Sequence, residues 1–252
     1  MRARTWVPPW DTRRAAEPTR RGGTRHTDAV LVLFDIDGTL VHGLPEGHAT
    51  AMTNAMRAVW DVPVTPDDVW GIRPAGRTDR EIARLVLRGH GVADADIDAA
   101  NAEWMDLACR MHAEVAHLHA PPVAAPDAAA VTAALAGMGA ELALVTGNLE
   151  AIGRAKVAAA GLGHQFAPGG GGFGSDSEVR ADLVRLARDR ARAGYTDDQV
   201  VVVGDTPRDI AAARAAGVRV IAVTTGAHDA AALADADAVA PHLTGVLTAL
   251  QA

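Results

Sequence analysis

The apolar run Val30 to Leu33 leads directly into Phe34-Asp35-Ile36-Asp37-Gly38-Thr39-Leu40, and this segment constrains the fold more than any other. A short apolar run bounded by a glycine turn predicts a buried strand. Asp35 and Asp37 are two residues apart, so in an extended chain their carboxylates point to the same side. Such a pair needs a cation to neutralise it, and Mg²⁺ prefers carboxylate oxygens. One aspartate held in this way can act as a nucleophile and the other as an acid and base.

Two further apolar runs also end in polar residues. Glu141 to Val145 leads into Thr146-Gly147-Asn148, where the hydroxyl can donate to a phosphate oxygen and the glycine lets backbone N–H groups approach. Val200 to Val203 leads into Gly204-Asp205-Thr206-Pro207-Arg208-Asp209, which carries two more carboxylates four residues apart. Parallel sheets bind ligands at the carboxyl ends of their strands, and these polar residues are expected there.

The rest of the second half alternates strand and helix patterns, which favours an α/β fold with a doubly wound, Rossmann-like parallel sheet. Further strands are expected at Val218 to Val223, at Asp237 to Ala240 and, briefly, at His164 to Ala167. Helices are expected at residues 127–138, 149–160, 177–193, 207–216 and 229–234. Gly161 and Gly217 follow two of these helices, where glycine commonly forms the C-terminal cap.

The first two strands are too far apart for a simple crossover. Roughly a hundred residues separate Asp35 from Thr146, far more than an ordinary connection needs. The intervening segment predicts an inserted α-helical domain over residues 44–121. Its helical patterns cover residues 48–60, 78–89 and 93–118. Thr78 is placed to N-cap the second of these helices.

The expected organisation therefore has three parts. Residues 28–43 and 122–252 form the core, residues 44–121 form the inserted domain, and residues 1–27 precede both. The first 28 residues hold seven arginines and three acidic residues without a clear periodicity. We expect residues 1–27 to form a flexible arm rather than a targeting peptide, because they lack an amphipathic pattern.

Composition narrows the functional classes. The 252-residue chain carries a net charge of −7, which gives no reason to expect nucleic-acid binding. Cys109 is the only cysteine, so an intramolecular disulfide is excluded, as is common in reducing compartments. No apolar run approaches the 18 residues that a membrane span needs. We expect a cytoplasmic protein without a membrane partner, and no oligomeric state follows from the sequence.

Together the motifs resemble those of the haloacid dehalogenase-like (HAD) hydrolase superfamily, in the same order along the chain. The segment around Asp35 is similar to the first motif of the family, Thr146 closes a strand as in the second, and Asp205 with Asp209 resembles the fourth. The helical insert resembles the C1-type cap, and Gly76-Arg77-Thr78-Asp79 resembles the start of a cap helix in phosphoglycolate phosphatase-like members. The resemblance implies a HAD core with a lid that selects the substrate.

The resemblance also implies a mechanism. Asp35 attacks phosphorus and becomes an aspartyl-phosphate, while Asp37 protonates the leaving alcohol and then deprotonates the attacking water. Mg²⁺ is held by the Asp35 carboxylate, the Asp37 backbone carbonyl and Asp205, with Asp209 as a direct or outer ligand. Thr146 binds phosphoryl oxygens. Asp37 favours a phosphatase, because dehalogenases of this family lack the second aspartate.

Five further residues are expected to support substrate binding. Backbone N–H groups around Gly38 and Gly147 join Thr146 on the phosphate, and Thr39 supports the loop. Asn148 either reaches the substrate or steadies its loop. Arg77 suits a carboxylate or phosphate of the substrate, and the alternative is a solvated arginine before a cap helix.

One motif departs from the family pattern. The third motif is usually a lysine that opens or precedes the helix before the fourth motif, and the stretch Gly174 to Asp182 contains none. Arg180 is the candidate for this role, because arginine can hold phosphate bidentately. Arg185 is further along and less well placed. Lys156, on the helix after the second motif, is expected to be exposed or structural.

The sequence thus predicts a Mg²⁺-dependent phosphatase that hydrolyses a small phosphate monoester, phosphoglycolate or a sugar phosphate. Two alternatives stay open. A β-phosphoglucomutase-like phosphomutase would return the phosphoryl group to a sugar rather than to water. A catalytically idle scaffold would bind a phosphorylated ligand, and the absent lysine of the third motif is its only support.

Overall fold

The computed structural model describes residues 30–43 and 46–251, and the arm expected at residues 1–27 lies outside them. A six-stranded sheet forms the centre of the fold, with strand order β5-β4-β1-β6-β7-β8 and every pairing parallel. Its strands are β1 (Leu31–Phe34), β4 (Glu141–Thr146), β5 (Gly172–Phe173), β6 (Val200–Gly204), β7 (Arg219–Val223) and β8 (Ala238–Ala240). The expected doubly wound parallel sheet is confirmed.

The register places the three motif-bearing strands side by side. β1 lies between β4 and β6, and Phe34, its last residue, pairs with both Leu144 and Val203. All four residues of β1 are fully buried, as expected for a strand covered on both faces. The residues that follow these three strands therefore emerge together at one edge of the sheet.

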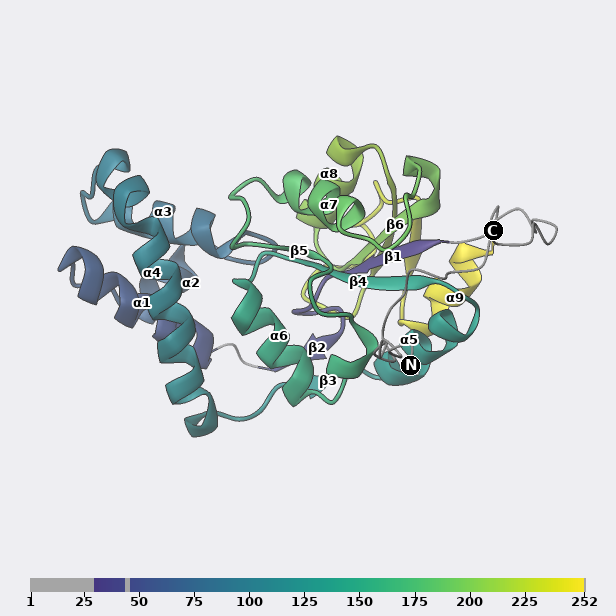
Figure 1. The fold of residues 1–252 in the computed structure, drawn as a ribbon, viewed down its shortest axis with the longest axis horizontal. Helices are drawn as coiled ribbons and strands as arrows, with labels where there is room; N and C mark the ends of the chain where they lie inside the picture. The colour runs from purple at the N-terminus through teal and green to yellow at the C-terminus, as the bar shows by residue number, and fades with distance from the viewer. Residues whose placement is uncertain (1–29, 44–45, 252) are drawn as a thin grey trace, which may run out of the picture.

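Helices cover both faces of the sheet (Figure 1). The helices α7 (Arg180–Asp189) and α8 (Pro207–Ala216) pack on one face, and α5 (Ala128–Gly137), α6 (Glu150–Ala159) and α9 (Thr244–Leu250) lie on the other side. Side chains alternate along β1: Leu31 and Leu33 join the core under α7 and α8, whereas Val32 and Phe34 join the core under α5 and α9. This alternation explains why β1 reads as a continuous apolar run.

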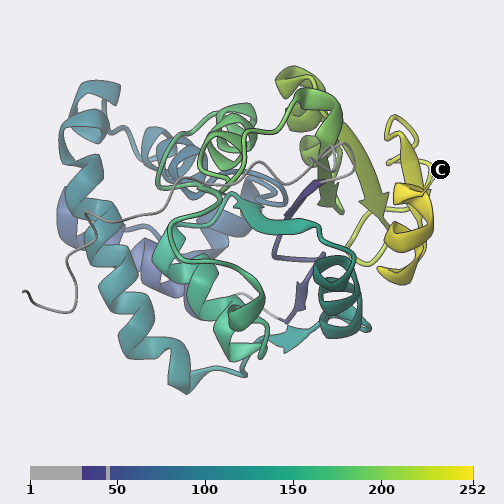
Figure 2. The same cartoon turned by 45° about the vertical axis from the view of Figure 1, so that its right-hand side comes forward.

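A helical unit is inserted between the first two core strands, and it lies at one end of the molecule (Figures 1 and 2). It consists of α1 (Glu46–Trp60), α2 (Pro66–Gly71), α3 (Asp79–Gly89), α4 (Asp94–Val115) and a short 3₁₀ helix (Ala116–Leu118). Trp104 on α4 is fully buried, and its indole N–H donates to the Met52 carbonyl at 3.3 Å. Thr78 caps α3 as expected, because its hydroxyl accepts from the Glu81 N–H at 3.1 Å.

The chain enters and leaves this helical unit through two adjacent segments. β2 (Val41–His42) and β3 (Val123–Ala124) pair antiparallel with each other. They join the helical unit, called the cap below, to the sheet and its helices, called the core. The first helix of the cap begins at Glu46, and its last 3₁₀ helix ends at Leu118.

The structure departs from the sequence expectations in several elements. His164 to Ala167 was expected to be a strand, but Gly163–Gln165 is a 3₁₀ helix, and the next strand is β5. Residues 229–234 form turns rather than a helix. The helices α2 and α9 were not expected.

Among the described residues, no helix has both the length and the hydrophobicity that a bilayer crossing requires.

Candidate active site

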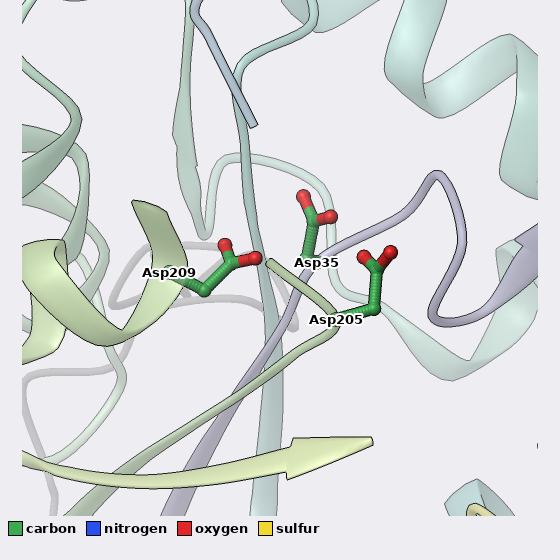
Figure 3. A group of neighbouring side chains, drawn as sticks. All are labelled: Asp35, Asp205 and Asp209. Carbon is green, nitrogen blue, oxygen red and sulfur yellow. The ribbon is translucent and has the colours of Figure 1, made fainter. Parts of the chain in front are cut away.

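Three carboxylates meet where β1 and β6 end. Asp35 follows β1, Asp205 follows β6, and Asp209 lies in the first turn of α8. Each offers an oxygen atom, and these atoms lie within 4.8 Å of one another. Figure 3 shows the three carboxylates facing a common space. All three residues are buried, so the sheet brings together the carboxylates that the sequence placed at separate strand ends.

Two threonine residues hold two of these carboxylates in place. Thr206 is the N-cap of α8, and the Asp209 carboxylate accepts from the Thr206 N–H at 3.0 Å, which completes a capping box. Thr39, fully buried, donates its hydroxyl to Oδ1 of Asp205 at 3.2 Å. Thr39 therefore supports Asp205 and does not line the cavity that could hold a substrate.

Gly38 makes the turn that brings the first motif beneath Asp205. Its φ of 84° lies in the left-handed region, which favours glycine. A Cβ atom at this position would overlap the Asp205 carboxylate. The Gly38 N–H already donates to the Val41 carbonyl at 2.9 Å, so this particular N–H is not available to a phosphate.

Arg180 occupies the position expected for the third motif. It opens α7, and its Nη2 lies 2.9 Å from Oδ1 of Asp35 while its Nε lies 3.0 Å from Oδ1 of Asp209. Its Nη1 donates to the carbonyl of Gly76 in the cap at 3.1 Å. Arg185 points elsewhere, to Asp182 on its own helix. One guanidinium group thus offsets part of the negative charge of the carboxylate cluster.

Burial and the remaining negative charge raise the pKa of two carboxyl groups in the cluster. Burial raises the pKa of Asp35 to about 7, with the charges of Asp209 and Asp37 adding to it and Arg180 opposing it. Burial also raises the pKa of Asp205 to about 8, and the charges of Asp35 and Asp209 add to this effect. A cation bound among these oxygens would offset the repulsion between the carboxylates, and the carboxyl groups would then lose their protons more easily.

The side chain of Asp37 lies outside this cluster. Its Oδ1 and Oδ2 lie 2.9 and 2.7 Å from Nζ of Lys156, and Nδ2 of Asn148 donates to Oδ2 at 2.8 Å. Partial loss of contact with water would raise the pKa of Asp37, but the Lys156 ammonium and these hydrogen bonds hold it below its usual value. Of the four residues expected at the metal, Asp37 is thus the one whose carboxylate is bound elsewhere.

Lys156 is a site residue that the sequence reasoning missed. An exposed or structural role was expected, but the side chain is only 6% exposed and bonds directly to Asp37. One signal could have identified it: Lys156 is the only lysine in a chain that otherwise uses arginine. Asn148 donates through its amide to Asp37 and Thr146, and it also lines the cavity.

The residues after β4 form the remaining wall of the site. The Thr146 hydroxyl accepts from Nδ2 of Asn148 at 2.8 Å, which leaves its own proton free for an acceptor such as a phosphate oxygen. The Gly147 carbonyl accepts from the Asp79 N–H in the cap at 2.8 Å. A Cβ at residue 147 would overlap the Arg77 carbonyl oxygen, so only glycine lets the cap approach this closely.

A cavity of about 510 Å³ lies between cap and core and opens onto these residues. The core contributes Asp35, Asp37, Thr146 and Arg180, and the cap contributes apolar side chains such as Met52 and Trp70 together with cations such as Arg73 and Arg77. Arg77 also pairs with Glu81 in the next turn. The arrangement places the carboxylates of Asp35 and Asp37 around one space, each beside a cation, Arg180 or Lys156.

Comparisons with known proteins agree with this geometry. The family model described as haloacid dehalogenase-like hydrolase matches residues 30–217. The chain is 31% identical to a phosphoglycolate phosphatase of Rhodospirillum rubrum over 206 residues, covering 77% of this chain and 79% of the relative. It is 30% identical to phosphoglycolate phosphatase 1 of Pseudomonas aeruginosa over 203 residues, covering 78% and 70%. The crystal structure of CbbY from Rhodobacter sphaeroides in complex with phosphate superposes with a TM-score of 0.65 at 20% identity, covering 89% of this chain and all of that chain.

Proposed function

Because the chain belongs to the haloacid dehalogenase-like hydrolases, we propose that it is a phosphatase that hydrolyses a small phosphate monoester. The observation that carries the proposal is the position of Asp35. Its carboxylate lies at the wall of the cavity, held by Arg180 and next to two further buried carboxylates. A nucleophile beside a guanidinium group and a site for a hard cation suits attack on a phosphoryl group.

Asp35 is the proposed nucleophile. One of its oxygens forms a bond to phosphorus, and the bond between phosphorus and the ester oxygen breaks. Asp37 gives the leaving alkoxide its proton, so that an alcohol departs and an aspartyl-phosphate remains. A water molecule then attacks phosphorus and gives a proton to Asp37, which releases inorganic phosphate and restores the Asp35 carboxylate.

Asp37 has to be protonated in the first step and deprotonated in the second, and the charges around it favour each form in turn. In the free protein Lys156 and Asn148 favour its carboxylate form, which is the form that accepts a proton from water. A bound phosphate brings negative charge close to Asp37 and raises its pKa, which favours the protonated form during the first step. Thr146 and Arg180 are the proposed donors to the phosphoryl oxygens.

The carboxylate cluster fits a divalent cation. Three buried carboxylates supply oxygen donors, which hard cations such as Mg²⁺ prefer, and burial together with mutual repulsion raises the pKa of Asp35 and Asp205. Asp35, Asp205 and Asp209 are the proposed ligands, together with the backbone carbonyl of Asp37. When bound, Mg²⁺ supplies positive charge that stabilises the negative charge developing on the transferring phosphoryl group.

The cap is proposed to select the ester. Relatives that carry the name phosphoglycolate phosphatase make phosphoglycolate the leading candidate, with sugar phosphates as the second. Arg77 lines the cavity from the cap, where its guanidinium group can meet a carboxylate of the substrate. The proposed partner is thus a small phosphorylated metabolite.

The test is phosphate release from a panel of phosphate monoesters that includes phosphoglycolate and sugar phosphates, with Mg²⁺ or EDTA. Wild type is compared with Asp35→Asn and with Asp189→Asn, an exposed carboxylate on α7 that serves as the control. We expect Mg²⁺-dependent release that Asp35→Asn lowers by about 10³-fold or more and Asp189→Asn leaves intact. Release that survives Asp35→Asn contradicts the assignment, and isomerisation of a sugar phosphate without release indicates a phosphomutase.

A further inference from the structure

Lys156 is held in the site by three side chains from different parts of the fold. Its ammonium group lies against both oxygens of Asp37, 2.9 Å from Oδ1 of Asn148 and 3.2 Å from Nδ1 of His48. Asp37 is 47% exposed towards its surroundings, whereas Lys156 and His48 are 6% and 9% exposed. Lys156 therefore anchors a half-exposed carboxylate from beneath.

The contacts of Lys156 distinguish it from a phosphate-binding residue. An ammonium group has three N–H donors and no acceptor. Asp37, Asn148 and His48 together offer acceptors for all three donors. Lys156 also lines the cavity, but because its donors are engaged by these three side chains, it acts on a substrate through Asp37.

The same network extends into the cap. Because Lys156 can only donate, Nδ1 of His48 must accept, and the ring proton therefore lies on Nε2. Nε2 then donates to Oδ2 of Asp79 at 2.9 Å, and this carboxylate oxygen also accepts from the Leu149 N–H at 2.7 Å. His48 lies on α1 and Asp79 on α3, so residues of two cap helices help to hold the Lys156 ammonium group beside Asp37.

We propose that Lys156 is the positioning residue for Asp37, and that His48 and Asp79 make this positioning depend on a closed cap. The inference rests on the proposed function, because it assigns Asp37 to acid–base chemistry. When the cap lies on the core, His48 completes the set of acceptors around Lys156 and fixes its ammonium group. Asp37 then has one orientation, between Lys156 and the Asn148 amide.

The test uses two substrates that differ in how much the leaving group needs a proton. An alkyl ester such as phosphoglycolate requires protonation by Asp37, whereas p-nitrophenyl phosphate releases a stable anion without it. Lys156→Met keeps the length of the side chain and removes its charge. Arg154→Met is the matched control, because it removes a cation from the same helix that contacts Glu150 and Gly170 away from the cavity.

For Lys156→Met we expect kcat on the alkyl ester to fall by about 10²-fold, the lower part of the range for acid–base catalysis, with KM changed by less than about threefold. In rapid mixing with p-nitrophenyl phosphate, the variant should give a burst of one nitrophenolate per active site, since formation of the aspartyl-phosphate stays fast while its hydrolysis slows. In an Asp37→Asn background, Lys156→Met should have no further effect. Arg154→Met should match wild type in every assay.

Three kinetic results would overturn the proposal. A large rise in KM with an unchanged kcat would make Lys156 a substrate-binding residue. Equal loss on both substrates without a burst would make its role general rather than specific to Asp37. An additive loss in the Asp37→Asn background would show that the two residues act independently.

A crystal structure of Lys156→Met provides a readout that needs no activity. The Asp37 carboxylate should leave its place beside Asn148, and an unchanged Asp37 side chain contradicts the proposal. Lys156→Gln is examined in the same way if the methionine variant does not fold. Wild type that hydrolyses neither ester, with a displaced Asp37 in the variant, would refute the proposed function while leaving the positioning role supported.

Discussion

Asp35 and Asp205 are forced into one buried space by two neighbouring strands, and this proximity makes their protonation depend on what binds between them. Arg180 offsets part of their charge, yet burial and repulsion still raise the pKa of Asp35 to about 7 and that of Asp205 to about 8. In the unfolded chain both groups have a pKa near 4. The difference links folding stability to pH and to cation binding.

The metal-free protein should lose stability as pH rises from about 4 to 8. Below about pH 4 both states hold these protons, whereas at higher pH the unfolded state releases them before the folded state does. A divalent cation removes this penalty, and it competes with fewer protons at pH 8 than at pH 6. We therefore expect the rise in Tm on adding Mg²⁺ to be larger at pH 8 than at pH 6.

Thermal unfolding in EDTA and at one fixed Mg²⁺ concentration, at both pH values, checks this expectation. Asp205→Asn serves as the control, because it removes one of the two raised groups and a proposed ligand. The variant should show a smaller rise in Tm at pH 8. An equal rise at both pH values in wild type would contradict the linkage.

Some residues of the candidate site could be predicted from the sequence, and others could not. Asp35, Asp205 and Asp209 could be grouped because each follows an apolar run, and parallel strands bring such ends together. Arg180 was expected from the resemblance to the third motif of the family, and its guanidinium group contacts Asp35. Lys156 could not, since its surroundings include His48, which the cap brings from another part of the chain. Helix periodicity carries no information about such a partner.

At the scale of elements, α8 shows how one local motif serves both the helix and the site. Thr206 caps the helix, and Asp209 completes the capping box with one carboxylate oxygen while the other faces Arg180. The geometry of the helix start therefore fixes one member of the carboxylate cluster. A change at Thr206 should affect both the stability of the helix and the orientation of Asp209.

Thr206→Ala should lower the free energy of unfolding by about 1 kcal/mol, the usual cost of removing an N-cap side chain. Thr206→Ser keeps the hydroxyl that accepts from the Asp209 N–H, so it should retain most of that stability. Urea unfolding of the three proteins measures the difference. If serine loses as much as alanine, the methyl group of Thr206 rather than its hydroxyl accounts for the effect.

Elements that tertiary contacts create were the ones that sequence patterns missed. β5 is only two residues long and lies in a glycine-rich segment, where Gly172 is needed because a Cβ would overlap the Leu183 carbonyl oxygen. β5 has strand geometry because it pairs with the end of β4, and its sequence contains no apolar run that would predict a strand. Residues 229–234 carry the opposite error, since their alanines favour a helix while the structure has turns.

At the scale of the whole molecule, the cavity over the carboxylate cluster lies where cap and core meet. Backbone groups take part in this contact: the Asp79 N–H donates to the Gly147 carbonyl, and the Thr78 hydroxyl donates to the Glu178 carbonyl at 3.0 Å. Arg84 adds an ion pair with Glu178 across the same contact. The long insertion could be predicted from the spacing of the motifs, whereas these contacts depend on how the folded cap lies on the core.

Gly147 offers a test of this contact, because the cap backbone at Arg77 and Thr78 lies directly against it. Alanine at this position would place its Cβ against the Arg77 carbonyl oxygen and close to Cα of Thr78. Neither atom belongs to a flexible side chain, so the cap itself has to shift. We expect Gly147→Ala to lower kcat/KM on the order of 10²-fold, since a displacement of about 1 Å costs this much in a preorganised site.

The displacement should also be visible without a substrate. Hydrogen exchange should become faster at the start of α3, where the Asp79 N–H loses its acceptor, while β1, β4 and β6 keep their protection. Gly137→Ala, at the end of α5, is the control, because its Cβ would meet no atom within 4 Å and should stabilise the helix by up to about 1 kcal/mol. Full activity and unchanged exchange in Gly147→Ala would mean that the cap tolerates the added methyl group, and that the closeness at Gly147 is not what holds the active site together.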